Sequence, residues 1–139
     1  MQYRIFRATG SASVSCRKMR DDDFDLIIDA LIGCNLDAAP RGAIRDTIAW
    51  ANDTDSPILS LDVPSGIEAT YGTHPGEYIR ARQTMTLGLP KTGLLPELTG
   101  TLLLADVGIP VGVFERLEIS YTPPFGVDFV VPLRTLPTA

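Results

Sequence analysis

The stretch over residues 58–66, ILSLDVPSG, constrains the fold of this chain more than any other part of the sequence. Only Ser60 interrupts its apolar run, and such a run is typical of a parallel strand that is covered on both faces. The run ends at Asp62 and passes into a proline, a serine and a glycine, which are loop-forming residues. Because α/β proteins bind ligands at the carboxyl ends of parallel strands, Asp62 is the predicted centre of the site.

Other segments extend this pattern to a mostly parallel sheet. Further strands are predicted over residues 25–33, 84–89, 101–108 and 129–131. Apolar residues recur at i, i+3 and i+4 over 42–52, which predicts an amphipathic helix. A helix between two short apolar strands indicates a right-handed βαβ crossover, so Asp29 and Asp62 are expected to end neighbouring parallel strands. Lys91 follows the next strand and is expected at the same edge.

The rest of the chain is less regular. Residues 1–20 show only a brief strand-like pattern at 3–6 and are predicted to be an irregular amino-terminal segment, while 21–139 form one α/β domain. Residues 79–82 are expected to be a short helical or extended link. The strand at 101–108 is predicted at the edge of the sheet, and the proline-rich residues 113–139 as an irregular tail.

Composition excludes several classes of partner. A net charge of -5 argues against a nucleic-acid surface, which needs clustered lysine and arginine. No apolar run approaches the roughly 18 residues that a membrane span needs. Two cysteines, Cys16 and Cys34, are too few for a disulfide framework and lack zinc-ligand spacing, so a cytoplasmic protein without nucleic-acid or membrane partners is expected. Cys34 is interpreted as a small packing residue.

The strand-end residues have two interpretations from spacing alone. Asp29, Asp62 and Ser65 offer oxygen ligands, which suit a hard cation. Equally, both aspartates could simply cap loops by accepting backbone N–H groups. Lys91 is either positioned by its proline and glycine neighbours or solvated, and His74 is predicted to be an exposed turn residue. No nucleophile elbow, G-x-G-x-x-G fingerprint or P-loop is present.

Four ordered motifs resemble one known family. The sequence DLIIDALIG at 25–33, with the following Asn35-Leu36 and Pro40-Arg41-Gly42, is similar to the D-L-I-V-D-A-L-x-G-x-G-L…R-G segment of the YjeF N-terminal domain family, the NAD(P)H-hydrate epimerases. LDVPSG at 61–66 is similar to its V-D-[IV]-P-S-G motif. TMTL at 84–87 with PKTGL at 90–94 resembles its T-[VI]-T-F…P-K-x-G-L stretch, and ADVGIP at 105–110 resembles its x-D-[IL]-G-I-P ending.

This resemblance implies a Rossmann-like three-layer α/β/α domain with a mostly parallel sheet. It implies an isomerase that interconverts the R and S epimers of NADHX and NADPHX in nicotinamide nucleotide repair, alongside a separate dehydratase, and a homodimer. Asp62 matches the family's substrate-contacting acid/base carboxylate, and Lys91 a lysine near it. Asp29 and Ser65 match ligands of a bound potassium ion. The substrate-phosphate loop corresponds to seven residues: Gly33, Cys34, Asn35, Leu36, Asp37, Ala38 and Ala39.

The sequence also departs from the family pattern. The family's N-N-G-G-D-G loop, which supplies a further potassium ligand and much of the substrate pocket, has no counterpart here. Asn35 replaces the second glycine of the phosphate loop and can adopt the left-handed backbone conformation, whereas Asp37 adds negative charge. The chain is therefore interpreted as the carboxyl-terminal portion of such a domain. Its epimerase activity could be impaired by the absence of the N-N-G-G-D-G loop. The alternative is a non-catalytic dimerisation or adaptor module like those of RNA-processing proteins.

Overall fold

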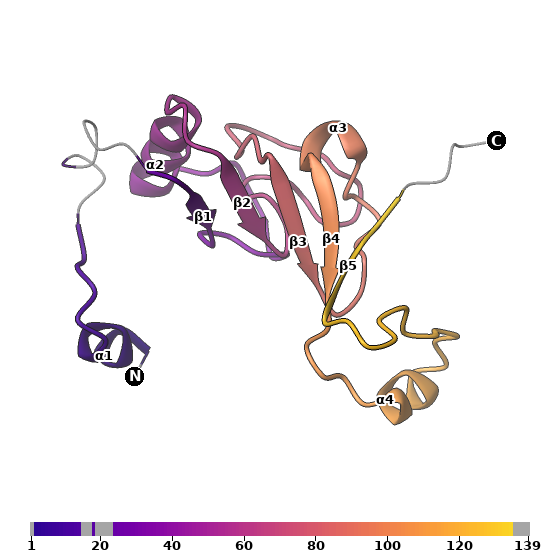
Figure 1. Ribbon diagram of the computed structural model, residues 1–139. Coiled ribbons are helices and arrows are strands. Elements are labelled where there is room, and N and C mark those ends of the chain that lie inside the picture. The colour runs from indigo at the N-terminus through magenta and orange to yellow at the C-terminus, as the bar shows by residue number, and fades with distance from the viewer. Residues whose placement is uncertain (1, 15–17, 19–23, 135–139) are drawn as a thin grey trace.

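The computed structural model describes residues 2–14, 18 and 24–134, and its centre is a five-stranded sheet (Figure 1). The strands lie in chain order: β1 (Ile27–Asp29), β2 (Ile58–Leu61), β3 (Gln83–Leu87), β4 (Thr101–Ala105) and β5 (Val130–Pro132). The first four are parallel and β5 is antiparallel to β4. The predicted mostly parallel α/β fold is confirmed. Strands β1, β3 and β4 are shorter than predicted, and β5 is shifted by one residue from the predicted 129–131.

Helix α2 (Gly42–Asn52) is the predicted crossover between β1 and β2. Its buried residues Ile48 and Ala51 pack with Ile58 and Ile79 in one hydrophobic cluster. The side chain of Asn52, the last residue of α2, accepts a hydrogen bond from the N–H of Arg80 at 2.9 Å and donates one to the carbonyl of Tyr78 at 2.8 Å. These bonds hold residues 79–82 as an extended link rather than a helix.

A second cluster lies under the loops that follow β2 and β3. It consists of Val63, Ile67, Ala69 and Leu94. Gly66 is required in this region because its φ is +102° and a Cβ there would lie 2.5 Å from the Glu77 carbonyl oxygen. The turn after the predicted site is therefore packed tightly against the chain that leads into β3.

Three predictions about irregular segments were wrong. Residues 3–6 belong to helix α1 (Gln2–Ala8) rather than a strand; no neighbouring strand pairs with them among the described residues, so local helical hydrogen bonds satisfy the backbone. Strand β4 is not at the edge, because β5 pairs with its outer side. Residues after 110 form helix α4 (Val111–Arg116), whose Phe114 packs against Tyr121 with ring centroids 4.9 Å apart. A further short helix, α3 (Pro96–Thr99), precedes β4.

The two faces of the sheet differ in how they are covered. Alternation and register put Ile27, Asp29, Ile58, Ser60, Thr84, Thr86 and Leu104 on one face, which we call the covered face. Most of these residues are buried beneath α2 and the connecting loops. The opposite face, which we call the open face, carries Ile28, Leu59, Leu61, Met85, Leu87, Leu103 and Val130. No described helix crosses it in Figure 1, and of its residues in the described strands only Ala105 is buried.

Candidate active site

The carboxyl ends of β1, β2 and β3 meet at one edge of the sheet because these strands are parallel and adjacent. Asp29 is the last residue of β1, and Asp62 follows β2 directly. Lys91 lies in the loop after β3. The structure therefore brings together two small groups of the predicted residues, Asp29 with Ser65 and Asp62 with Lys91.

Asp29 is buried and fully hydrogen-bonded. Its side chain accepts bonds from Ser60 Oγ at 2.7 Å, from Ser65 Oγ at 2.6 Å and from Ser65 N at 2.9 Å, and a longer one from Leu31 N at 3.3 Å. Ser65 Oγ in turn accepts the N–H of Ile32 at 2.8 Å. Burying a carboxylate requires such partners, and here they tie the loops after β1 and β2 to each other.

Asp62 is held differently. Its φ of +70° lies in the left-handed region, which is uncommon for a residue other than glycine and marks a position that the surroundings impose. Its Oδ1 accepts bonds from Lys91 Nζ and from Leu87 N, the latter at 3.2 Å. Its Oδ2 has no partner among the described residues and lies 4.0 Å from where a Cβ on Gly33 would be. One oxygen of this carboxylate is anchored and the other faces the start of the predicted phosphate loop.

Lys91 is positioned rather than solvated. Besides Asp62, its ammonium group donates to the carbonyl of Leu87 at 3.0 Å and to Thr86 Oγ1 at 3.1 Å. About a fifth of each side chain is exposed, 22% for Lys91 and 20% for Asp62. The ion pair is therefore partly shielded from solvent while it stays open to a ligand.

The predicted phosphate loop at residues 33–39 has no regular secondary structure and is mostly exposed; within it only Leu36 and Ala39 are half-buried. Its far end approaches the turn at 71–76, since a Cβ on Gly76 would lie 3.1 Å from that of Ala39. Cys34 is an exposed free cysteine, so its interpretation as a packing residue was wrong. Asn35 does not have a positive φ, so this loop does not use the left-handed backbone conformation that asparagine can adopt. Cys16 lies outside the described residues.

Two residues with buried hydroxyl groups, Ser60 and Thr86, belong to the site but were not predicted from the sequence. Ser60 binds Asp29, and Thr86 accepts a hydrogen bond from Lys91. Both are fully buried and point to the covered face. Their signal in the sequence was a polar residue inside an otherwise apolar strand, which needs a partner when buried. His74, in contrast, is exposed as predicted, and its ring lies 4.4 Å from that of Tyr78.

The loop that carries Lys91 is braced by the loop that follows Gly66. Thr92 Oγ1 donates to the carbonyl of Thr70 at 2.7 Å, and Gly93 N donates to that of Ala69 at 2.8 Å. Within the bracing loop, the backbone N–H groups of Tyr71 and then Thr70 hold the pKa of Glu68 below its ordinary value. Away from the site, burial and then the charge of Asp106 raise the pKa of Tyr121.

The donor chemistry near Asp29 suits a hard monovalent cation. Carboxylate, hydroxyl and carbonyl oxygens gather there, since Ser65 Oγ lies 3.1 Å from the carbonyl oxygen of Ile32. Among the described residues, no three histidine, cysteine, aspartate or glutamate side chains cluster as metal ligands. A cation here would therefore rely on hydroxyl and main-chain oxygens beside Asp29.

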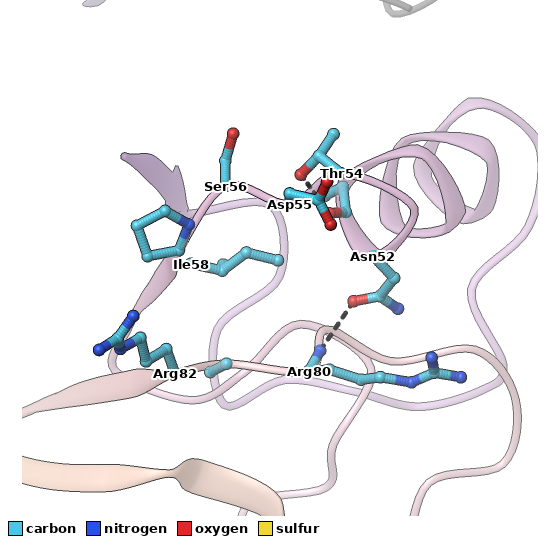
Figure 2. Close-up of a pocket in the computed structure, with 10 residues that line it drawn as sticks. Asn52, Thr54, Asp55, Ser56, Ile58, Arg80 and Arg82 are labelled. Atoms are coloured by element: carbon cyan, nitrogen blue, oxygen red, sulfur yellow. Dashed lines mark hydrogen bonds between the residues drawn. The ribbon is translucent and has the colours of Figure 1, made fainter. Parts of the chain in front are cut away.

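A hollow of about 260 Å³ lies at the amino-terminal ends of β2 and β3, opposite the edge that holds Asp62 (Figure 2). It lies between the end of α2 and the link that carries Arg80 and Arg82. Figure 2 shows that these two guanidinium groups point away from each other, so they do not converge on one ligand group. Asp55 also lines the hollow and adds a negative charge. The chemistry of the molecule is concentrated instead at the edge that holds Asp62.

The parallel sheet carries a buried aspartate and an ion-paired aspartate at its carboxyl edge, which is the edge where α/β proteins commonly bind ligands. The chain belongs to the family described as YjeF-related protein N-terminus, whose model matches residues 1–93. The resemblance inferred from the four motifs is thereby confirmed.

Similar proteins carry three names: NAD(P)H-hydrate epimerase, Bifunctional NAD(P)H-hydrate repair enzyme Nnr and Enhancer of mRNA-decapping protein 3. An NAD(P)H-hydrate epimerase of Dehalogenimonas lykanthroporepellens is 43% identical over 133 residues, covering 95% of this chain and 54% of that protein. An Enhancer of mRNA-decapping protein 3 of Xenopus laevis is 35% identical over 138 residues, covering 97% of this chain and 25% of that protein. The chain thus spans about half the length of the epimerase relative.

A solved structure has the same fold. The crystal structure of yeast ynu0 superposes with a TM-score of 0.67 at 19% sequence identity, covering 85% of this chain and 50% of that one. Separately, none of the helices in the described residues is both long enough and apolar enough to cross a membrane.

Proposed function

We propose that this chain acts in an NAD(P)H-hydrate epimerase, an isomerase that interconverts the R and S epimers of NADHX and NADPHX. The observation that carries the proposal is the geometry of Asp62, with Oδ1 anchored by Lys91 and Leu87 and Oδ2 directed toward Gly33. The relatives named NAD(P)H-hydrate epimerase support the substrate class. The domain responsible is proposed to span residues 21–139, as the carboxyl-terminal portion of the family domain.

The chemistry needs a group that moves one proton. To invert the hydrated carbon, a bond at that carbon must open and close again on the other face, either the C–O bond or a bond of the ring. In the ring route the hydroxyl oxygen loses its proton as the ring bond breaks and the released ring atom takes one up, and closure reverses both transfers. In the C–O route the oxygen first gains a proton and leaves as water, and the water that adds to the other face loses one. Asp62 Oδ2 is placed to exchange the proton at this oxygen in either route. Lys91 fixes the carboxylate by holding Oδ1, so that proton transfer occurs at the oxygen that faces the substrate loop.

The loop at residues 33–39 is proposed to hold the substrate phosphates, and Asp29 and Ser65 to hold a potassium ion. The exposed backbone of the loop leaves N–H groups available to phosphate oxygens. When bound, potassium would order the loops and offset phosphate charge. The hydrogen bonds from Ser65 to Asp29 and from Ile32 to Ser65 already order these loops through the chain's own residues.

The remaining parts of the proposal concern partners and location. The relatives named Bifunctional NAD(P)H-hydrate repair enzyme Nnr support a functional link to a dehydratase. A homodimer and a cytoplasmic location are proposed on the family resemblance and the composition. The net charge of -5 agrees with a protein that does not bind nucleic acid.

The test is an epimer-interconversion assay on the purified chain. NADHX epimers are mixed with a dehydratase specific for the S epimer, and the rate at which the R epimer disappears is measured. Asp62→Asn should lower the rate about 100-fold or more, because general acid–base catalysis contributes that much. Asp106→Asn is the matched control. Asp106 also follows a strand, β4, but among the described residues its carboxylate accepts a hydrogen bond from Gly108 N alone, so the rate should not change.

Two results would contradict the proposal. One is a wild-type rate no higher than that of the uncatalysed reaction, and the other is an Asp62→Asn variant as active as the wild type. In the first case the non-catalytic adaptor module becomes the better explanation, since relatives named Enhancer of mRNA-decapping protein 3 align over nearly the whole chain.

A further inference from the structure

The open face of the sheet is apolar although nothing described covers it. Ile28 is 58% exposed, Val130 41% and Leu87 38%, and the other large apolar side chains of this face are only half-buried. Parallel sheets occur almost only with both faces covered, and their strands are accordingly apolar on both faces. The strands of this chain are apolar on both faces, as in a sheet buried on both sides, but the described elements cover only one face.

The outer edge of β1 is also uncovered. Strand β1 pairs with β2 on one side and with no described strand on the other, so its outward backbone groups are available for pairing (Figure 1). Beside this edge lies a mainly apolar groove of about 270 Å³, whose lining includes Phe24, Leu26, Leu31 and Trp50. An exposed, apolar edge strand next to such a groove is a template for the addition of another strand.

We propose that the β1 edge, the groove and the open face together form the docking surface for the complementary half of a family domain. That partner is an α/β segment that adds a strand beside β1 and lays an apolar helix on the open face over Ile28 and Leu59. The lengths support this occupant: the chain aligns with 54% of the Dehalogenimonas relative and with half of the yeast structure, so each has a comparable length of chain outside the match.

A second copy of this chain fits the surface less well. A face-to-face pair of sheets would leave both β1 edges without a strand, whereas the homodimer proposed above can form through another surface. The inference rests on the uncovered surface and on family membership, and it does not depend on the proposed epimerase activity.

The experiment is complementation in trans. The part of the Dehalogenimonas relative outside the aligned 133 residues is co-expressed with this full chain, and the complex is purified through a tag on the relative's part. A 1:1 complex is expected by light scattering, together with slower hydrogen exchange at β1. Trp50 is the only tryptophan of the chain and lines the groove, so its emission should shift to shorter wavelength when a tryptophan-free partner docks.

Variants locate the interface. Ile28→Lys places a charge on the edge strand and, independently, Leu26→Lys places one in the apolar groove; each should weaken binding at least 10-fold, because a charge opposes strand pairing and apolar docking. Val127→Lys is the matched control, an exposed apolar side chain (94%) far along the chain in the segment before β5, and should bind like the wild type. Thermal unfolding of each free variant shows whether it is folded.

The outcomes separate the alternatives. Retention of the 1:1 complex in Val127→Lys but not in the two edge variants supports the proposal. It is overturned if the relative's part stays insoluble during co-expression, if no complex forms, or if the edge variants bind like the wild type. A homodimer of this chain that protects β1 would instead assign the surface to a second copy. Because the readout is binding, an inactive complex contradicts only the proposed enzymatic function.

Discussion

At the scale of single residues, Asp29 and Asp62 end neighbouring strands but have different surroundings. Asp29 is 3% exposed and accepts four hydrogen bonds from groups of the chain itself, whereas Asp62 keeps one oxygen without a partner among the described residues. A carboxylate with several donors orders the loops around it, and one with a free oxygen can act on a ligand. Asp29 therefore fixes the loops that would surround the proposed potassium ion, and the acid/base proposal belongs to Asp62.

Replacing Asp29 should destabilise the fold strongly. Asp29→Ala leaves the hydroxyl group of Ser60 and the backbone N–H groups of Ser65 and Leu31 without their acceptor, and the Ser65 hydroxyl loses its shorter hydrogen bond. We therefore expect the free energy of unfolding to fall by about 3 kcal/mol or more. Urea unfolding followed by circular dichroism measures this. Asp46→Ala is the control: this exposed residue pairs with the adjacent Arg45 and with no other described side chain, and its loss should cost about 0.5 kcal/mol or less. Equal losses for both variants would contradict the structural role of Asp29.

At the scale of elements, the site depends on loops that brace one another. The loop after β2 contributes Asp62 and Ser65 and then supports the loop after β3, which carries Lys91, through the bonds of Thr92 and Gly93. Glu68 closes the bracing loop by accepting the N–H groups of Thr70 at 2.8 Å and Tyr71 at 2.7 Å. The position of Lys91 is thus set by contacts between loops rather than by a strand or a helix alone.

Acid should loosen this bracing loop. The pKa of Glu68 is lower in the folded state than the ordinary value of 4.5, so its stabilising contribution is fully present above that value and is lost as pH falls through the folded pKa. We expect the amides of Thr70 and Tyr71 to lose protection as the pH falls below 4.5 and through the folded pKa of Glu68, as followed by NMR at each pH. Glu68→Gln should remove this pH dependence, whereas Glu97→Gln, an exposed change in the first turn of α3, should not. Unchanged titration in Glu68→Gln would assign it to another group.

At the scale of the whole molecule, the number of neighbours that each element pairs or packs with falls from the central strands outward. Strands β2 and β3 pair on both sides, β1 pairs on one side, and α1 has seven residues whose described side chains are all exposed. A helix of that length is marginal in water without a packed face. The elements with the fewest packing partners are therefore at the margins of the described structure: the edge strands β1 and β5, and helix α1.

Hydrogen exchange should report this order directly. Amides of β2 and β3 should exchange only through global unfolding, whereas those of α1 should exchange within about 10-fold of an unfolded chain, because local opening there breaks few contacts. NMR exchange at neutral pH measures both classes in one sample, and β5, which pairs on one side, serves as an internal comparison. Strong protection of α1 in the chain alone would show that it packs on a surface in solution.

The sequence by itself determined the central strands, the crossover helix and the strand-end positions of Asp29 and Asp62, because apolar runs, helical periodicity and loop residues are local signals. It also identified the family through four ordered motifs. Only the tertiary structure decided that Asp29 is saturated with donors while Asp62 is paired with Lys91, and that Ser60 and Thr86 join them, because these contacts link residues about 5 to 36 positions apart. It likewise decided that β5 extends the sheet beyond β4 and that the apolar face with Ile28 stays uncovered, since pairing partners and covering layers are set by distant parts of the chain.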